Sequence, residues 1–255
     1  MILTGYHASK EVLLHRANLA RILYLEENRN DHRARELETL ARSAGVPIKR
    51  SPSSFFLRQG AAGSAFAIQV DALPQYDDNT FLSGLEGQPV LLIEEVSDPQ
   101  NLGSIFRVAE CSGFSHVALT LHRTAPVNDT VMTASAGAAA HLTLGRVRNT
   151  TNFINHLKEL GYWVVGTAVE GGNLYSTEIP PPFCIVVGSE EKGLRRITRE
   201  ACDELVALPV LGRIGSLNVA NATAAVLYEM VRRTLGETEQ ALRESRKPSN
   251  PSSDT

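Results

Sequence analysis

Six runs of apolar residues between positions 90 and 210 constrain the fold of this chain more than any other feature. They are VLLIEEV from position 90, HVALTL from 116, HLTLGRV from 141, YWVVGTA from 162, CIVVG from 184 and ELVALPV from 204. Helical patterns separate most of them. Continuous Val, Ile and Leu runs between helices are typical of parallel strands that helices cover on both faces. The sequence therefore predicts an α/β fold with a parallel sheet.

The residues before position 90 predict a second, smaller α/β unit. The expected elements are helices near 7–17 and 31–44, the second closed by Gly45, a strand at 21–27, a short segment at 53–59 and a strand at 65–71. The last strand, AFAIQVD, alternates like an edge or half-buried strand.

Shifts in composition divide the chain into four parts. The expected parts are a small domain at 1–73, a linker rich in turn formers at 74–89, the sheet domain at 90–235 and a disordered tail at 236–255. The tail follows from the loss of apolar periodicity after Gly236 and from the Ser and Pro content that comes later.

The charge of the chain is unevenly distributed. Residues 1–70 hold ten Lys and Arg against six Asp and Glu, whereas the whole chain has a net charge of −3. An excess of basic residues at the front suggests a surface that binds nucleic acid, and a solvated helix face is the alternative.

The remaining composition limits the classes of protein to consider. No apolar run approaches the roughly 18–20 residues that span a bilayer, and no secretory signal is visible, so we expect a cytoplasmic protein without a membrane partner. The three cysteines, Cys111, Cys184 and Cys202, form no CxxC pair and have no nearby His at metal spacing. We therefore expect buried, reduced thiols and no metal site.

Ligands of parallel α/β sheets bind beyond the carboxyl ends of the strands, in loops that lead into helices. The first such loop, SDPQNLGSIFR, precedes a helix expected from about Leu102 to Gly113. Asn101 is a plausible N-cap of that helix, and Gly103 permits close approach of a backbone or a ligand. Arg107 either forms an ion pair on the helix surface, with Glu110 or Asp98, or holds a phosphate or hydroxyl of a ligand.

The second loop, GSEEKGLRR at 188–196, is a glycine-rich turn between a strand and a helix. It lacks the Lys-Ser/Thr pair of a P-loop, which excludes that motif. No GxGxxG fingerprint occurs, so a dinucleotide-dependent oxidoreductase is poorly supported. Structural and ligand-binding roles stay open for this loop.

The third loop, LPVLGRIGSLN at 208–218, leads into an apolar helix. Ser216 and Asn218 stand where the loop ends. Either residue could cap the helix, which is a purely structural role, or the two could shape a ligand site.

Taken together, the three loops resemble the signature motifs of the SpoU/TrmH family of RNA ribose 2′-O-methyltransferases, in the SPOUT superfamily. The motifs appear as NLGSIFR at 101–107, GSEEKG at 188–193 and LPVLGRIGSLNV at 208–219, in the family's order. The stretch TASAGAAAHLTL from Thr133 is also similar, and the resemblance covers residues 90–234. The front domain, opening GYHASKEVLL, resembles more weakly the ribosomal-protein-like substrate-binding domain of the branch that methylates guanosine in 23S ribosomal RNA.

The resemblance implies a fold that sequence pattern alone does not reveal. A deep trefoil knot would place the last strands and helix through a loop, in exception to the usual unknotted topology. Members of the family are homodimers that associate through the knotted domain.

The resemblance also implies an activity and a set of site residues. The cofactor would be S-adenosylmethionine, and the reaction would be methylation of a ribose 2′-oxygen in structured RNA. The implied catalytic residues are Asn101, Arg107, Glu190, Ser216 and Asn218. The implied cofactor contacts are Gly188, Ser189, Leu208, Val210, Ser216 and Leu217.

Three alternatives follow from the same sequence. The favoured function is methylation of ribosomal RNA, the near alternative is methylation of transfer RNA, and the third is a non-catalytic RNA-binding protein of the same fold.

Arg107 raises a separate question, because a guanidinium stays protonated in proteins and is a poor base. It would activate the 2′-hydroxyl only with help from a substrate phosphate, or else orient the substrate and stabilise charge.

Overall fold

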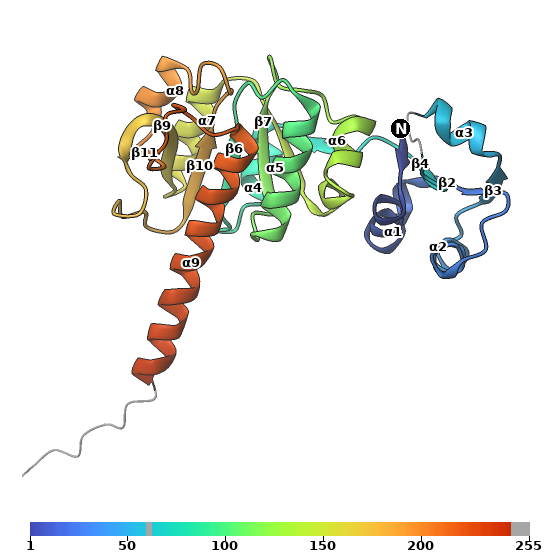
Figure 1. Ribbon diagram of the computed structural model, residues 1–255. Coiled ribbons are helices and arrows are strands. Elements are labelled where there is room, and N and C mark those ends of the chain that lie inside the picture. The colour runs from blue at the N-terminus through green and yellow to red at the C-terminus, as the bar shows by residue number, and fades with distance from the viewer. Residues whose placement is uncertain (60–62, 246–255) are drawn as a thin grey trace, which may run out of the picture.

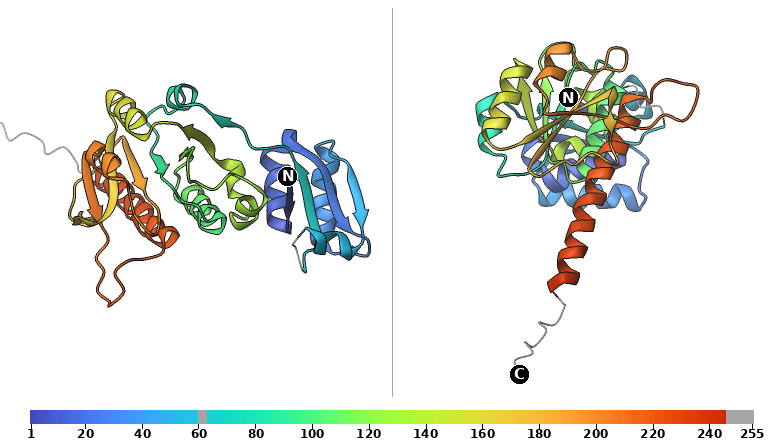
Figure 2. Two further views of the ribbon diagram at one scale, coloured as in Figure 1. Left: turned by 90° about the horizontal axis from the view of Figure 1, so that it is seen from above. Right: turned by 90° about the vertical axis from the view of Figure 1, so that its left-hand side faces the viewer.

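The computed structural model describes residues 1–59 and 63–245 and contains two sheets joined by a short connection (Figure 1). A four-stranded sheet belongs to the N-terminal unit and a seven-stranded sheet to the C-terminal unit. Seen from above, the two units lie side by side along one axis (Figure 2).

The N-terminal sheet has the order β1-β4-β2-β3. Its strands are β1 (Ile2–Thr4), β4 (Phe66–Val70), β2 (Ala20–Glu26) and β3 (Ile48–Ser51). β4 pairs antiparallel with both β1 and β2, so the expectation of an edge strand at 65–71 is wrong. Four of its five residues are buried, since both neighbouring strands and the covering helices exclude water from it.

Helices of the N-terminal unit begin close to the expected positions. They are α1 (Tyr6–His15), α2 (His32–Ser43) and α3 (Ser53–Arg58), with the 3₁₀ helix η1 (Ala17–Leu19) between α1 and β2. Asp31 caps α2 by accepting a hydrogen bond from the backbone N–H of Ala34 at 3.0 Å. Gly45 follows its end with a φ of 69°, a conformation that glycine adopts without strain.

The C-terminal sheet is parallel throughout, with the order β11-β9-β10-β6-β7-β8-β5. The six expected strands are β6 (Val90–Ile93), β7 (His116–Thr120), β8 (Thr143–Val147), β9 (Trp163–Asn173), β10 (Phe183–Val187) and β11 (Glu204–Ala207). The α/β prediction for this part of the chain is confirmed.

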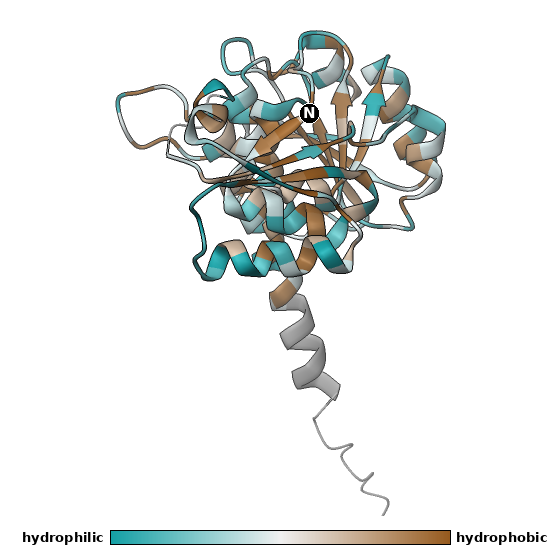
Figure 3. Ribbon diagram, turned by 90° about the vertical axis from the view of Figure 1, so that its right-hand side faces the viewer, coloured by the Kyte–Doolittle hydropathy of each residue, from teal (hydrophilic) through white to brown (hydrophobic). Residues whose placement is uncertain are grey.

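Helices cover both faces of this sheet. Leu91, Ile93 and Ile185 belong to the core that includes α5 (Pro99–Cys111), α6 (Asp129–Ala134) and α9 (Val219–Ser245). Val90 and Leu92 belong to the core that includes α7 (Thr150–Glu159). Alternate residues of each strand thus face opposite layers, and both layers are apolar, which explains the uninterrupted runs in the sequence (Figure 3).

The segment at 74–89, expected to be a linker, contains two elements. β5 (Gln75–Tyr76) pairs with β8 and extends the C-terminal sheet at its edge. α4 (Asp78–Ser83) follows, and its Phe81 is buried against the aromatic ring of Phe153 in α7. A two-residue strand and a six-residue helix are too short to produce a periodic pattern.

The last helix is longer than expected. α9 runs to Ser245 and extends from the body of the molecule, so residues 236–245, where a disordered tail was expected, continue the helix in the structure (Figure 1). This stretch, GETEQALRES, is rich in strong helix formers and holds no proline. The rest of the expected tail, 246–255, lies outside the described residues.

The three cysteines are all free. Cys184 is buried and Cys202 is half-buried, and burial raises the pKa of Cys202 to about 12 and that of Cys184 well above its usual value. Cys111 is exposed, so the expectation of a buried thiol is wrong there, because its position on α5 faces away from the sheet. No helix in the described part of the chain is long and apolar enough to cross a membrane.

Candidate active site

The carboxyl ends of β10 and β11 and the middle of β9 border a cavity of about 440 Å³. Loops that follow β10 and β11 form two of its walls, as expected for a parallel sheet. All six residues expected to contact the cofactor line this cavity: Gly188, Ser189, Leu208, Val210, Ser216 and Leu217. A volume of this size is in the usual range for sites that bind small molecules, about 300–1,000 Å³.

The loop after β10 forms one wall of the cavity and depends on two glycines. A Cβ on Gly188 would lie 2.3 Å from the carbonyl carbon of Gly193 and 2.4 Å from the backbone nitrogen of Leu194. Ser189 and Gly193 exchange two backbone hydrogen bonds, of 3.2 and 2.9 Å, and Gly193 has a φ of 62°. The loop therefore folds back on itself so closely that no side chain fits at position 188.

Two further walls were not anticipated from the sequence. α9 contributes Val219, Ala222, Thr223 and Val226 from the face that packs against the sheet, and β9 contributes 167–170. The helical spacing of the α9 residues predicted burial but did not distinguish a core contact from a cavity wall.

The loop between β11 and α9 closes the cavity from the outside. Val210 and Leu217 are half exposed, and Leu211 and Ile214 lie open to solvent at its tip. Figure 2 shows this loop protruding from the body of the molecule. The apolar side chains that line the cavity are thus continuous with an exposed apolar loop.

One hydrogen-bonded cluster joins the three predicted motifs. The Nδ2 group of Asn218 donates to Glu190 Oε1 at 2.6 Å and to Asn101 Oδ1 at 3.0 Å. Asn101 Nδ2 also donates to Glu190 Oε1, at 2.6 Å. Residues 89 and 117 positions away from Asn101 therefore meet its side chain, and each motif contributes one member.

Asn218 has a second role that the sequence left open. Its Oδ1 accepts hydrogen bonds from the backbone N–H groups of Ala220, at 2.9 Å, and Asn221, at 3.4 Å. Its oxygen therefore caps α9 while its amide nitrogen donates to the cluster. The same residue thus acts as a helix cap and belongs to the hydrogen-bonded cluster.

The structure corrects the role expected of Asn101 and decides between the two roles considered for Gly103 in favour of close approach to another backbone. Asn101 lies inside α5 and does not cap it; Asp98 does, accepting from the backbone N–H of Gln100 at 3.0 Å. Gly103 serves packing, since a Cβ there would lie 2.5 Å from Ala134 Cβ in α6. The glycine thus brings two helices together and does not face the cavity.

Arg107 is separate from the cluster. Its side chain is exposed on α5, lines neither of the two hollows near the site and makes no hydrogen bond or ion pair with the residues that the structure describes. The expected surface pairs with Glu110 and Asp98 are therefore not formed. The guanidinium is directed to solvent, where it is accessible to an anionic ligand.

An ion pair between a buried carboxylate and a partly exposed arginine supports the loop after β10. Glu94, fully buried at the end of β6, accepts from the Nε of Arg195 at 2.8 Å and from its backbone N–H at 2.9 Å. Thr198 Oγ1 donates to the same carboxylate at 2.6 Å. The sequence analysis missed this pair. A charged residue inside the run VLLIEEV was the available signal, since a buried carboxylate needs a partner.

A second, polar hollow of about 420 Å³ adjoins the first and shares Ser189, Glu190, Glu191 and Lys192 with it. Its other lining residues include Glu95, Asp98 and Arg123. Glu190 thus stands between an apolar-walled cavity and a polar one. This arrangement suits a reaction between a largely enclosed small molecule and a polar group that approaches from solvent.

The fold and the site together define a class of protein: a parallel α/β protein with a ligand cavity at the carboxyl ends of its strands and an amide–carboxylate cluster at the rim. Residues 88–228 match the model of the SpoU rRNA Methylase family. Because the match spans more than half of the chain, the chain belongs to the SpoU rRNA methylase family.

Named relatives and solved structures agree with this assignment. The chain is 36% identical to a 23S rRNA (guanosine-2′-O-)-methyltransferase RlmB from Ralstonia nicotianae, over 91% of this chain and 95% of the relative. A protein of the same name from Pseudomonas aeruginosa is 35% identical over 89% and 94%. In fold, the chain is similar to the SpoU methyltransferase AviRb from Streptomyces viridochromogenes, in complex with AdoMet, with a TM-score of 0.78 at 24% identity over 92% and 90%.

Proposed function

We propose that this protein transfers a methyl group from S-adenosylmethionine to a ribose 2′-oxygen of 23S ribosomal RNA. The observation that carries the proposal is the convergence of three motifs, distant in sequence, on one hydrogen-bonded cluster, and two of these motifs also line the cavity. Family membership and relatives named as 23S rRNA guanosine-2′-O-methyltransferases support the reaction and the substrate.

The cavity fits the cofactor on two grounds. Its volume suits a small molecule, and the close backbone approach at Gly188 leaves main-chain groups at the wall where a bulkier residue would intrude. Gly188, Leu208 and Leu217 would hold the cofactor largely through backbone groups, with Ser189, Val210 and Ser216 beside them. S-adenosylmethionine supplies an electrophilic methyl on a sulfonium.

The cluster at the rim would set the geometry of the reaction. Asn101 and Asn218 fix the Glu190 carboxylate from two sides, which leaves its other oxygen free of these amide bonds. Glu190 would orient the polar groups that enter, and Ser216 would contact the ligand from the third loop. Holding the reacting atoms about 3–3.5 Å apart and aligned supplies about 7–11 kcal/mol in well-oriented reactions.

Arg107 would act on the RNA. Because a guanidinium keeps its proton at physiological pH, its contribution is charge and a fork of N–H donors, which suit a phosphate beside the target ribose. In one arrangement, the bound phosphate would position Arg107 against the 2′-hydroxyl and help it to activate that group. In the other, Arg107 would only orient the substrate. Its exposed position on α5 is compatible with either arrangement.

The N-terminal unit would dock the RNA. Arg42, Lys49 and Arg58 are exposed and make no ion pair with a described residue. Cations that are not neutralised by neighbouring carboxylates are available to phosphates, which dominate the affinity for RNA and make it dependent on salt. On this proposal, residues 1–73 bind the substrate RNA and residues 90–235 form the methyltransferase domain.

We further propose the finer features that the family resemblance implies: a trefoil knot, a homodimer formed through the knotted domain, and a cytoplasmic location. Support for the knot comes from the path of the chain, which leaves β11 at the sheet edge and returns at Asn218 to contact α5. The apolar residues Leu211 and Ile214 of the protruding loop are suited to a contact between copies.

The target is tested by incubating the protein with labelled S-adenosylmethionine and total RNA from cells that lack this gene. Label in the large-subunit ribosomal RNA is expected. Label in transfer RNA would support the alternative target, and no label despite measured cofactor binding would support a non-catalytic RNA-binding protein.

Arg107→Ala tests the role of that residue in the same assay. We expect loss of methylation with cofactor binding unchanged, because Arg107 lies outside the cavity. Full methylation by this variant would exclude both proposed roles, activation of the hydroxyl and positioning of the RNA.

A further inference from the structure

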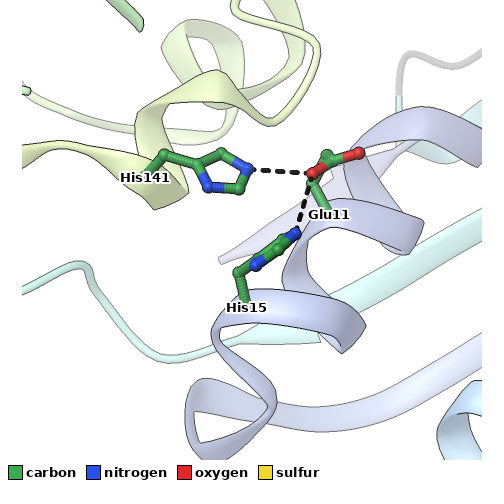
Figure 4. A group of neighbouring side chains, drawn as sticks. All are labelled: Glu11, His15 and His141. Carbon is green, nitrogen blue, oxygen red and sulfur yellow. Dashed lines mark hydrogen bonds and ion pairs between the residues drawn. The ribbon is translucent and has the colours of Figure 1, made fainter. Parts of the chain in front are cut away.

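Two histidines and one glutamate converge where the two units of the molecule meet (Figure 4). Glu11 and His15 lie on α1 of the N-terminal unit, four residues apart and therefore on the same face of the helix. His141 ends the 3₁₀ helix η2 (Ala138–His141) of the C-terminal unit. This cluster is remote in sequence from the three motifs of the proposed active site.

The three side chains direct ligand atoms at one point. The Nε2 of His141 lies 2.8 Å from Glu11 Oε2, and the Nε2 of His15 lies 3.6 Å from the same oxygen. One ligand atom from each residue lies within 4.8 Å of the others. Tetrahedral ligands about 2.0–2.1 Å from a zinc ion stand roughly 3.3 Å apart, which is close to both measured distances.

The surroundings hold the cluster in place. Gly137, with a φ of 92°, lets η2 approach α1 so closely that a Cβ there would lie 3.0 Å from Glu11 Cβ. Arg16 Nε donates to the carbonyl of Ala140, next to His141, at 2.6 Å. Ile2 N–H donates to Asp129 Oδ2 across the same seam, at 3.1 Å. The ligands are therefore largely preorganised.

We propose that Glu11, His15 and His141 bind a divalent zinc ion that joins the N-terminal unit to the C-terminal unit. Two imidazoles with one carboxylate favour a first-row transition metal such as zinc over magnesium or calcium, which prefer oxygen ligands. The side chains are partly exposed, by 25% to 51%, so the ion can enter and water can occupy the fourth position. The carboxylate supplies the one negative charge of the site.

The sequence analysis predicted no metal site because it considered only the cysteines. His141 lies 126 residues after His15, so the Glu-x-x-x-His spacing on α1 offered just two ligands. Only the fold brings in the third. The proposal is independent of the reaction proposed for the protein, since none of these residues lines the cavity.

Calorimetric titration of the metal-free, untagged full-length protein with zinc chloride tests the proposal. We expect one zinc ion per chain with a dissociation constant of about micromolar or below. His15→Gln and His141→Gln should each weaken binding by about tenfold or more, the scale on which even supporting residues affect metal affinity. His7→Gln is the matched control, because His7 is an exposed histidine on the same helix, outside the cluster, and its variant should bind as the parent does.

Two further readouts make the test decisive. Cobalt chloride in place of zinc should give the visible absorption of a tetrahedral Co²⁺ complex in the parent and in His7→Gln. Zinc should also raise the Tm of these two proteins but not that of folded His15→Gln or His141→Gln. Binding that survives in both cluster variants, or no binding by the folded parent at tenfold excess of zinc, would overturn the proposal.

Discussion

Asn218 shows how a single side chain connects the fold to the site. Its oxygen accepts from the first turn of α9, and its nitrogen donates to Glu190 and Asn101. An asparagine has both groups on one planar amide, whereas serine, threonine and aspartate supply only part of this pattern. This requirement explains why a residue that looks like a simple helix cap belongs to the site as well.

Asn218→Asp separates the two roles. Aspartate is as good an N-cap as asparagine, so we expect the capping contribution to the free energy of unfolding to change by less than about 0.5 kcal/mol. The amide donor is lost, however, and a second carboxylate faces Glu190. Each hydrogen bond to a charged group contributes about 1.5–3 kcal/mol, so methylation should fall by at least about tenfold.

Asn149→Asp is the matched control, because Asn149 caps α7 by accepting from Asn152 N–H at 3.1 Å and lies outside the site. Its stability and methylation should match the parent. Equal methylation by Asn218→Asp and Asn149→Asp would show that the amide donor of Asn218 is dispensable.

The sequence predicted the roles of individual residues less completely than it predicted the strands and helices. Asn101 and Asp98 are both good capping residues three positions apart, and only Pro99 after Asp98 indicated where α5 begins. The convergence of Asn101, Glu190 and Asn218 followed from the family resemblance, and spacing alone did not predict it. Glu94 and Arg195 were missed because their partners lie about 100 residues apart.

At the scale of elements, the loop after β10 depends on the absence of one side chain. Gly188→Ala would force a Cβ against the backbone of Gly193 and Leu194. Such overpacking costs about 1–3 kcal/mol in stability. The loop must shift, so we also expect weaker binding of S-adenosylmethionine, measured by calorimetry.

Gly212→Ala, in the loop between β11 and α9, provides the comparison, because a Cβ there meets no atom within 4 Å and its φ is not in the left-handed region. This variant should keep its stability and cofactor affinity. If both variants bind the cofactor equally, the close backbone contact at Gly188 does not shape the cavity.

Arg233 links α9 to the segment after β9, and a carboxylate of the same helix, Glu229, holds Arg233 in place. Glu229 accepts from Arg232 and Arg233, and these hydrogen bonds lower the pKa of its carboxyl to about 2. Arg233 in turn donates to the carbonyl oxygens of Thr177, at 2.7 Å, and Leu174 in the segment after β9. The pair therefore anchors the helix that forms a wall of the cavity.

This anchor predicts a pH dependence. A carboxyl whose pKa is lower in the folded protein stabilises the fold above the unfolded pKa of about 4.3, and that contribution is lost as the pH falls toward 2. Glu229→Gln should therefore lower the free energy of unfolding by about 1–3 kcal/mol at pH 7, and its deficit should shrink between pH 4.3 and 2.

Glu200→Gln is the control, since Glu200 pairs with Arg196 in an exposed i,i+4 ion pair that contributes little to stability. Denaturant unfolding over this pH range provides the measurement. A constant deficit in Glu229→Gln at all pH values would contradict an ionic origin of the stabilisation.

Elements were predicted well wherever burial imposed a pattern. β6, β7 and β10 produced the clearest runs because both of their faces are covered, which leaves almost no exposed position in them. β5 and α4 were missed because they are too short for periodicity to register. The far end of α9 was missed because a helix that leaves the body has no apolar face to reveal it, and only its propensity for helix remains.

At the scale of the whole molecule, two units meet at a narrow seam and divide the proposed work. The N-terminal unit presents exposed cations, and the C-terminal unit holds the cavity and its cluster. Contacts across the seam, from Arg16 to Ala140 and from Ile2 to Asp129, set the distance between the RNA-docking surface and the cavity. Neither the order of the sheets nor this seam could be predicted from composition, because the strand pair β6–β10 joins residues 94 positions apart and the seam contacts join residues 124 and 127 positions apart.

The central claim is that the cavity and its cluster methylate a ribose oxygen. Mass analysis of nucleosides is the most direct test, after nuclease digestion of large-subunit RNA that the protein has treated with labelled S-adenosylmethionine. The account predicts that the label resides in one 2′-O-methylated nucleoside, with the added mass on the ribose. Label on a base, at any position, would contradict it.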